Sequence, residues 1–497
     1  MSQPNILCFV TDQHRADHLG CYGNRQIRTP NIDRLAGEGV TFTQSYVANP
    51  VCMPNRATWF TGKYPSAHGL TENGYTLDPC AAVLPRTLSD NGYQTASIGK
   101  VHLAPFMMTR ELAERECELY ESQQYWNEGG ELPDSYYGFD EVCLVDGHGP
   151  YILGDYKRWL DSEHPGAYAK LQKSGALVPP TGARDCWKAS IPEELHYNTF
   201  IADRTIDFLR RRDTSRPFFT WCSFPDPHHP FSPPRPYCDM YSPEEIEFAP
   251  ARREGELADL PDYFEESYRG RIGTGGLHGD PSRITDEDYR EIHALTYGMI
   301  SMVDAQVGRV VSALEEMSLL EDTIIVFMSD HADLMGDHWL INKGPYLFRG
   351  LVRVPTIWRM PKGLGGGREC SGLVSAVDFC PTVLNLAGVP ASEGMQGKSY
   401  EGILSGAAEQ TRDSVLIEYD ESYISDRLRQ LRTRDWAITA HLERHDGLLF
   451  DLKNDPDELH NLWDDPGAQG AKSGLLAELH RQIGDPGGWP PPKKVHA

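Results

Sequence analysis

The stretch NILCFVTDQ, residues 5–13, indicates how this chain folds. Its apolar residues run without interruption from Ile6 to Val10, and the stretch ends in the polar pair Asp12-Gln13. An unbroken apolar run bounded by polar residues is typical of a strand that is buried on both faces of a sheet. Because such sheets are largely parallel and covered by helices, the stretch predicts a strand of an α/β fold.

Three further segments have the same pattern of an apolar run that leads into polar side chains. Residues 93–99, 217–224 and 323–329 lead into Lys100 and His102, into His228 and His229, and into Asp330 and His331, respectively. In an open α/β sheet, ligands bind outside the carboxyl ends of the strands. The four polar clusters are therefore expected to converge on one active site.

Helical patterns lie between the predicted strands. Residues 195–212 carry an apolar face, and residues 286–320 carry apolar side chains at helical spacing after Thr285, which is suited to cap a helix. Residues 110–194 and 235–283 are rich in Gly, Pro, Tyr and acidic residues and lack clear periodicity. These two segments are interpreted as insertions and lid-like loops over the site.

The expected architecture is a large, mostly parallel central sheet flanked by helices, in residues 1–390. A helix over residues 379–386 ends before Gly388 and Pro390. Beyond it, four short segments predict strands, at 414–418, 428–433, 436–440 and 448–451. Residues 391–497 are therefore expected to form a small C-terminal subdomain of short antiparallel strands and a helix.

Composition limits the partners of the chain. A length of 497 residues, 40% of them apolar, suffices for a large α/β domain and a smaller unit. The net charge of −25 argues against nucleic acid and against an anionic membrane surface as partners. The 11 cysteines are odd in number and scattered, and neither a leader segment nor an apolar run of membrane-spanning length is present. We expect a reduced, cytoplasmic protein without membrane contact.

Asp12-Gln13 and Asp330-His331 are two pairs of metal-ligand residues, each at the end of a predicted strand. Either pair alone is equally open to the interpretation that it caps a following helix. Together, the two carboxylates would repel one another in a cleft unless a cation lay between them, which predicts one divalent metal ion. Three oxygen donors and one imidazole suit Mn²⁺ better than an all-oxygen Ca²⁺ site, and both ions remain candidates.

The run Cys52-Met53-Pro54-Asn55-Arg56 predicts the start of a helix, because Pro54 is tolerated in a first turn. Cys52 would then lie where free backbone N–H groups favour an anion, with Arg56 one turn further along. A nucleophile at such a position suits displacement on a sulfate or phosphate ester. The alternative is a buried structural cysteine, which is the commoner role of a single Cys.

The pattern C-x-P-x-R resembles that of the sulfatase family, in the alkaline phosphatase superfamily, and companion motifs follow in order to about residue 462. The resemblance implies an alkaline phosphatase-like fold and oxidation of Cys52 to Cα-formylglycine by a formylglycine-generating enzyme. The hydrated aldehyde would be the nucleophile and would also contact the metal. Gln13 and His331 look more like the subgroup of arylsulfatases and phosphonate monoester hydrolases than like other sulfatases.

The resemblance also implies roles for further residues. Lys100 would contact the sulfate, and His102 would assist product release. His228 would donate to the sulfate and the leaving-group oxygen, with Lys343 as a further sulfate-binding cation and Asn73 on the nonbridging oxygens. Without the motifs, Lys100 and His102 would be a surface lysine and a loop histidine, and Asn73 would belong to an ordinary Asn-Gly turn.

Three functions compete. The first is arylsulfatase-like hydrolysis of a small anionic sulfate monoester, favoured because Lys100 and His102 stand where the phosphonate-hydrolase subgroup is expected to carry uncharged hydroxyl residues. The second is a phosphonate monoester or phosphodiester hydrolase with promiscuous sulfatase activity. The third is a catalytically silent binding protein, against which the intact run from Cys52 to Arg56 and all four predicted metal ligands argue. A homo-oligomer is compatible with each.

Overall fold

A large mixed sheet forms the centre of the computed structural model, which describes residues 3–105, 132–133, 135–272, 280–363, 366–420, 423–424 and 426–483. Within these residues the sheet has nine strands in the order β10-β2-β9-β8-β1-β7-β4-β5-β6. In that order they span Arg368–Cys370, Val40–Phe42, Thr356–Arg359, Thr323–Ser329, Asn5–Thr11, Phe218–Ser223, Gln94–Gly99, Glu141–Asp146 and Leu153–Gly154.

The five strands β8, β1, β7, β4 and β5 are neighbours and all run parallel. Leu7 of β1, for example, lies opposite Thr220 of β7 and Ile325 of β8. Antiparallel pairs occur only towards the sides, where β9 pairs with β8 and β2, and β6 pairs with β5. The prediction of a mostly parallel central sheet is therefore confirmed, and the carboxyl ends of five strands meet at one edge.

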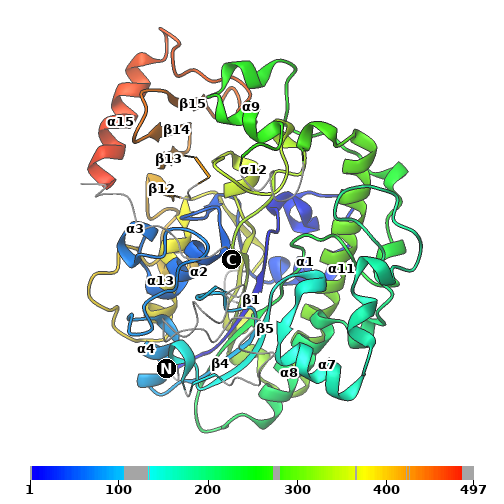
Figure 1. Cartoon of the computed structure of the whole chain (residues 1–497). Coiled ribbons are helices and arrows are strands. Elements are labelled where there is room, and N and C mark those ends of the chain that lie inside the picture. The colour runs from blue at the N-terminus through cyan, green and yellow to red at the C-terminus, as the bar shows by residue number, and fades with distance from the viewer. Residues whose placement is uncertain are drawn as a thin grey trace.

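Helices cover both faces of the sheet (Figure 1). Along β1, Ile6 and Val10 belong to one hydrophobic core and Leu7 and Phe9 to another, so the strand is buried on both sides. The first core lies under α2 (Cys52–Thr61), α4 (Leu84–Asp90) and α13 (Phe379–Leu386). The second lies under α1 (Pro30–Gly37), α7 (Asp155–Glu163), α8 (Tyr197–Arg211) and α11 (Asp286–Glu316). Burial on both faces is the reason for the unbroken apolar runs.

A second, antiparallel sheet follows in the C-terminal part. It runs through β12 (Ser414–Tyr419), β13 (Leu428–Thr433), β14 (Trp436–His441) and β15 (Gly447–Asp451), and α15 (Gln469–Ile483) comes after it. Leu431, Ile438 and Leu449 of this sheet share the hydrophobic core of α2 and α13. The small sheet is therefore packed against the main body rather than separated by a linker.

Short elements complete the chain. They are β3 (Ser45–Tyr46), α3 (Pro65–His68), α9 (Tyr263–Tyr268), α12 (Arg349–Val352), β11 (Val374–Ser375) and α14 (Glu401–Leu404). Thr285 caps α11 as predicted, in a capping box with Asp288. None of the helices in the described part of the chain combines the length and apolar character needed to cross a bilayer.

The interpretation of residues 110–194 as loops is wrong in part. Residues 110–131 and 134 lie outside the described residues, but β5, β6 and α7 come from the remainder of this segment, and β5 belongs to the parallel part of the sheet. The sequence of β5, EVCLVD, has only a brief apolar centre between acidic residues. A run that short does not separate a strand from a loop by periodicity. Of the second segment, residues 273–279 also lie outside the described residues.

Candidate active site

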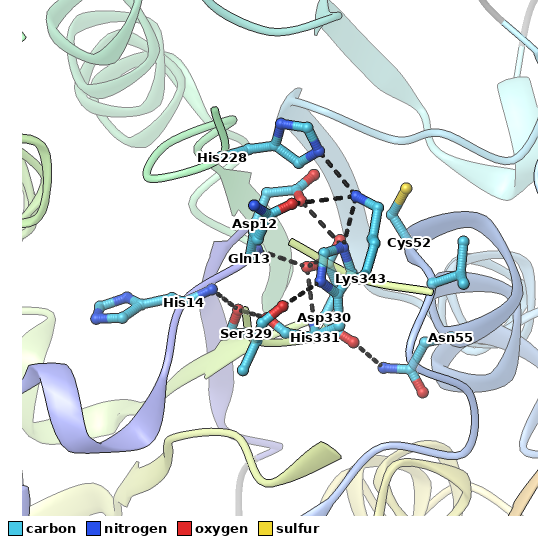
Figure 2. A network of polar contacts seen from close by, with 12 residues as sticks. Asp12, Gln13, His14, Cys52, Asn55, His228, Ser329, Asp330, His331 and Lys343 are labelled. Carbon is cyan, nitrogen blue, oxygen red and sulfur yellow. Dashed lines mark hydrogen bonds and ion pairs between the residues drawn. The ribbon is translucent and has the colours of Figure 1, made fainter. Parts of the chain in front are cut away.

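The predicted polar clusters meet at the carboxyl edge of the parallel strands. Asp12 follows β1, Lys100 follows β4, and the Lys100 Nζ lies 2.7 Å from the Asp12 Oδ2. His228 lies in the loop after β7, and its Nε2 is 2.8 Å from the Nζ of Lys343, which lies beyond β8. Figure 2 shows Asp12, His228 and Lys343 gathered beside Cys52. Four neighbouring strands thus bring distant residues to one place.

Asp12, Asp330 and His331 form the metal-ligand group found among the described residues, with one ligand atom from each within 4.8 Å of the others. All three side chains are fully buried. Asp330 Oδ1 accepts backbone N–H groups from Gln13 at 3.2 Å and His331 at 2.9 Å, so its carboxylate is held rigidly. The Cys52 sulfur lies outside this group.

Two features show that these residues fit a divalent cation. The Oδ1 atom of Asp12 is buried and accepts no hydrogen bond from the described residues. The His331 Nδ1 donates to the Ala332 carbonyl oxygen over 2.8 Å, which leaves Nε2 facing the Asp12 Oδ1 at 3.4 Å. A backbone acceptor on the far nitrogen is the usual support of a metal-bound imidazole. The amide oxygen of Gln13 is turned towards the same centre, where it accepts from Lys343 over 3.2 Å.

The contacts of Asp12 and His331 determine whether these two residues are charged. Burial opposes ionisation of Asp12, but the Lys100 ammonium outweighs it, with a contribution from His331, and holds the pKa of this carboxyl well below its usual range. Burial and Lys343 oppose a charge on His331, whereas Asp330 and Asp12 favour it and raise the pKa of His331 to about 9. Without a metal, a proton on His331 therefore faces the Asp12 carboxylate in the place that suits a cation.

Cys52 is the first residue of α2, as the motif predicts, and it is buried. The side chain of Asn73 satisfies the start of this helix, because its Oδ1 accepts from the Met53 N–H over 3.2 Å. The Asn73 Nδ2 lies 3.4 Å from the Cys52 sulfur. Burial raises the pKa of the Cys52 thiol, but the ammonium groups of Lys343 and Lys100 reverse the shift and bring the pKa below its ordinary value.

Arg56 is fully buried and joins α2 to four strand ends. Its Nε donates to Asp330 Oδ2 over 2.7 Å, and one terminal nitrogen lies 3.4 Å from Asp12 Oδ2. The other terminal nitrogen donates to the Lys100 carbonyl oxygen at 3.0 Å and to the Ser223 hydroxyl at 3.1 Å. Arg56 therefore neutralises and orients the two carboxylates rather than projecting towards an open anion site.

Lys343 and His102 are two further predicted residues of the site. The Lys343 Nζ contacts three groups at once, namely Gln13 Oε1 at 3.2 Å, His228 Nε2 at 2.8 Å and His331 Nε2 at 3.2 Å. His102 is buried two residues after Lys100, and burial, with Lys100 and Arg56, holds its pKa well below the ordinary value. It is therefore neutral at physiological pH.

His228 has a defined tautomer. A carbonyl oxygen can only accept, so the contact of 2.6 Å between the His228 Nδ1 and the His229 carbonyl oxygen places a hydrogen on Nδ1. Its Nε2 then accepts from the Lys343 ammonium. Burial, with His148 and Lys343, holds the pKa of His228 well below its ordinary value. The acidic proton of this pair is carried by Lys343.

Three residues of the site were missed by sequence reasoning. His148, after β5, places its Nε2 3.0 Å from the Lys100 Nζ and stacks on His228 with ring centroids 3.5 Å apart. The sequence did carry the pattern that predicts such a residue, since residues 141–148, EVCLVDGH, are another strand that leads into a polar side chain. Asp333 accepts from the Gln13 Nε2 over 2.5 Å, and Asn55 donates to the Asp330 carbonyl oxygen over 2.7 Å. No sequence pattern around Asp333 or Asn55 predicts these contacts.

Comparison with known proteins agrees with this arrangement. A family model described as Sulfatase matches residues 4–389, and one described as N-sulphoglucosamine sulphohydrolase, C-terminal, matches residues 336–485. An arylsulfatase of Clostridium perfringens is 31% identical over 479 residues, which cover 93% of this chain and 90% of the relative.

Solved structures resemble the chain over nearly its whole length. The phosphonate monoester hydrolase of Agrobacterium radiobacter is 30% identical with a TM-score of 0.83, over 97% of this chain and 96% of that one. A protein solved in complex with its substrate D-glucosamine-2-N,6-O-disulfate has the same fold, with 22% identity and a TM-score of 0.73, over 98% of this chain and 99% of that one. With the family model spanning most of its residues, the chain belongs to the sulfatase family of the alkaline phosphatase superfamily and is a sulfuric ester hydrolase.

Proposed function

We propose that the chain hydrolyses sulfate monoesters in the manner of an arylsulfatase, with a formylglycine derived from Cys52 and one divalent metal ion. One observation carries the proposal. Cys52, at the start of α2, lies between the ammonium groups of Lys100 and Lys343, and both lower the pKa of its thiol. Two fixed cations beside a nucleophile position suit an ester that develops negative charge in the transition state. The arylsulfatase relative supports the same choice.

The metal would be held by Asp12, Gln13, Asp330 and His331. When bound, a divalent cation polarises the oxygens of the ester and adds positive charge at the reacting centre. Arg56 keeps the two carboxylates in place through its contacts with Asp330 and Asp12. Mn²⁺ and Ca²⁺ remain the candidate ions, because the set combines oxygen donors with one imidazole.

Maturation of Cys52 by a formylglycine-generating enzyme supplies an aldehyde whose hydrate carries two hydroxyl groups on one carbon. Asn73 holds the backbone of this position through the Met53 N–H. Lys100 and Lys343 bind the oxygens of the sulfuryl group. His102, kept neutral by burial and by Lys100, takes up the proton that is lost when sulfate is released.

The leaving alcohol receives its proton from the pair of Lys343 and His228. Lys343 carries the proton in the resting structure and donates to the His228 Nε2 over 2.8 Å. Lys343 supplies a proton to the His228 Nε2, and His228 passes this proton to the ester oxygen. This assignment refines the expectation that His228 donates to the leaving-group oxygen, because its own Nε2 has no hydrogen to give until Lys343 supplies one.

A phosphonate monoester or phosphodiester hydrolase is the second candidate. Gln13 and His331, together with the phosphonate monoester hydrolase of similar structure, favour it. The charged pair Lys100 and His102 favours the sulfate monoester.

The test is a comparison of kcat/KM for an aryl sulfate, a phenylphosphonate ester and a phosphate diester that share the same phenol. The sulfate is expected to be the best substrate of the formylglycine-containing enzyme. A clear preference for the phosphonate would replace the first candidate by the second. Cys52→Ala protein, prepared identically, controls for contaminating hydrolases and should be inactive on all three.

A further inference from the structure

Arg184 carries a buried guanidinium that lacks a counter-ion at its tip. Both terminal nitrogens are inaccessible to solvent and have no hydrogen-bond partner among the described residues. Within the described part of the chain, the Nε alone makes a polar contact, with the Asp185 Oδ2 at 3.3 Å, and the side chain as a whole is 15% exposed. A buried donor without a partner is costly, and more so when it is charged, so such a group calls for an explanation.

Backbone pairing places Arg184 beside the histidine stack of the active site. The Phe231 N–H donates to the Asp185 carbonyl oxygen over 2.7 Å, and the Trp187 N–H donates to the Phe231 carbonyl oxygen over 3.2 Å. His229, two residues before Phe231, stacks on His228 with ring centroids 4.1 Å apart. Burial lowers the pKa of His229, and Lys343 and Arg184 lower it further, so the guanidinium charge acts at this ring.

The carboxylates nearby do not compensate this charge. Burial lowers the pKa of Arg184 despite Asp185 and Asp333, and burial raises the pKa of Asp185 despite Arg184. Both shifts mean that the attraction between Arg184 and Asp185 is smaller than the cost of burying their charges. Asp333 already accepts hydrogen bonds from the Gln13 side chain and from the backbone of Met335 and Asn342.

Other buried arginines of the chain behave differently. Arg56, Arg429 and Arg432 each reach a carboxylate with a terminal nitrogen, on Asp12, Asp420 and Glu458 respectively. Their pKa values are raised, because these carboxylates outweigh burial. The fold therefore pairs its buried guanidinium groups in these places, whereas neither terminal nitrogen of Arg184 reaches a carboxylate among the described residues.

We propose that Arg184 binds a second anionic group, a carboxylate or a further sulfate, on the alcohol part of the substrate. The inference rests on the proposed hydrolase function. His228 serves the leaving-group oxygen, His229 is the next ring of the stack, and Arg184 lies beyond it, on the leaving-alcohol side of the site. The guanidinium is planar, and its two terminal nitrogens have no hydrogen-bond partner among the described residues. Two such donors match the paired oxygens of an oxyacid.

The burial of Arg184 does not argue against a role in binding the substrate. His228 and Lys343, which serve the reacting ester, are themselves only 6% exposed. A substrate that reaches them enters a region as enclosed as that around Arg184. An anion bound there would supply the charge that Arg184 lacks, in surroundings where charge-assisted hydrogen bonds are strong.

Matched ester pairs test the proposal. The substrates are 3- and 4-carboxyphenyl sulfate, each paired with the corresponding carbamoylphenyl sulfate, which has the same shape without the charge. The ratio of kcat/KM for the charged over the neutral member is compared between wild type and variants, so that intrinsic reactivity cancels. In Arg184→Gln, we expect this ratio to fall about tenfold or more in at least one pair, through loss on the charged ester alone.

Two further variants sharpen the result. Arg184→Lys should keep part of the ratio, because it retains the charge but not the fork geometry. Arg283→Gln removes an equal charge from a side chain that is 83% exposed, and it should leave the ratio unchanged. The melting temperature of Arg184→Gln should be equal to or above that of wild type, because the change removes an uncompensated buried charge.

The proposal is overturned if the ratio is the same in wild type and Arg184→Gln for both pairs. It is also overturned if Arg184→Gln lowers the melting temperature and slows both members of each pair equally, since Arg184 would then be a structural brace. The same phenols as methylphosphonate esters separate this question from the main assignment. If wild type hydrolyses only the phosphonates, the sulfate assignment fails, and the ratio for the phosphonate pairs still decides the role of Arg184.

Discussion

The Nζ of Lys343 lies 2.8 Å from the Nε2 of His228, and the hydrogen of this contact belongs to the lysine. The pair joins the segment after β8 to the loop after β7, two strands separated in the sheet only by β1. Lys343 also reaches Gln13 and His331, so one ammonium group links the proton supply of the leaving group to the predicted metal ligands.

The Lys343–His228 pair predicts a leaving-group dependence. Lys343→Ala and His228→Ala should each lower kcat for alkyl sulfates by about 10²–10³, the loss typical of one fixed donor at a developing charge. Nitrophenyl sulfate should be affected far less by His228→Ala, because its phenolate leaves without protonation. Lys343→Ala should also lower kcat for this ester, though less than for alkyl sulfates, because Lys343 binds the sulfuryl oxygens as well. The measurement is kcat against leaving-group pKa for a series of esters. Equal losses on activated and unactivated esters would contradict the assignment.

Because the two residues act as a unit, their losses should not add. The double variant Lys343→Ala/His228→Ala is expected to be little worse on alkyl sulfates than the poorer single variant. Additive losses would mean that the lysine and the histidine act independently, for instance with Lys343 on the sulfuryl oxygens only.

Cys52 is predicted to become formylglycine in a host that contains the modifying enzyme. Mass spectrometry of the tryptic peptide spanning residues 35–56 should find an aldehyde in place of the thiol. Cys52→Ala should fold with nearly unchanged thermal stability, because Asn73 caps α2 through the Met53 backbone and not through residue 52 alone. Full activity of protein that carries only the thiol would refute the mechanism.

Metal binding should depend on pH through His331. In the metal-free protein Asp330 and Asp12 raise the pKa of His331 to about 9 against burial and Lys343, so below this pH the metal competes with a proton. Affinity is expected to rise by up to about tenfold per pH unit between pH 6 and pH 8. Titrations of Mn²⁺ and Ca²⁺ at several pH values measure this slope. His331→Asn should bind more weakly and with a flatter pH profile, and an equally steep profile in that variant would assign the proton elsewhere.

Arg56 should contribute to stability mainly when no metal is bound. Arg56→Ala leaves Asp330 without its buried partner and Asp12 with Lys100 alone, which is expected to cost about 3–5 kcal/mol in the free energy of unfolding. A bound divalent ion would offset part of this loss, because it supplies positive charge to the same carboxylates. Urea unfolding with and without Mn²⁺ tests both statements. Arg283→Ala, at the surface, is the control, and a loss from Arg56→Ala that is unaffected by metal would contradict the shared site.

The metal ligands themselves give a simpler test. Asp12→Ala should reduce both metal content and turnover, because the remaining ligands include only one carboxylate. Elemental analysis of purified wild type and variant measures the content. An active wild-type enzyme without any divalent metal would exclude the site, whatever the behaviour of the variant.

Local sequence was sufficient for much of the fold. The strands at 5–11 and 323–329 and the helix at 379–386 begin and end where they were predicted. Their apolar runs are long and end at Gly, Pro or charged residues, so the pattern is unambiguous. The capping box of Thr285 and Asp288 was also predictable from the sequence, because both partners lie within one turn. The helix after it ends at Glu316, earlier than predicted, since apolar residues continue into the following turn.

Short apolar runs and single polar residues were insufficient to predict the rest of the fold and of the site. β5 has too brief an apolar centre to be separated from a loop, and His148 was lost with it. Asp333 and Asn55 are ordinary polar residues in the sequence, and they matter only because they hold Gln13 and Asp330. No property of a short window predicts which side chain another will contact across the sheet.

The sequence by itself determined the strands and helices with long apolar patterns, the motif from Cys52 to Arg56 and the edge of the sheet at which its polar residues gather. Tertiary structure alone decided which charges meet. Arg56 pairs with Asp330, 274 positions along the chain, whereas Arg184 and Asp185 are adjacent and compensate one another poorly. Secondary structure depends on interactions within a few residues, but the energy of a buried charge depends on distance and on water exclusion, which exist only once the strands are assembled.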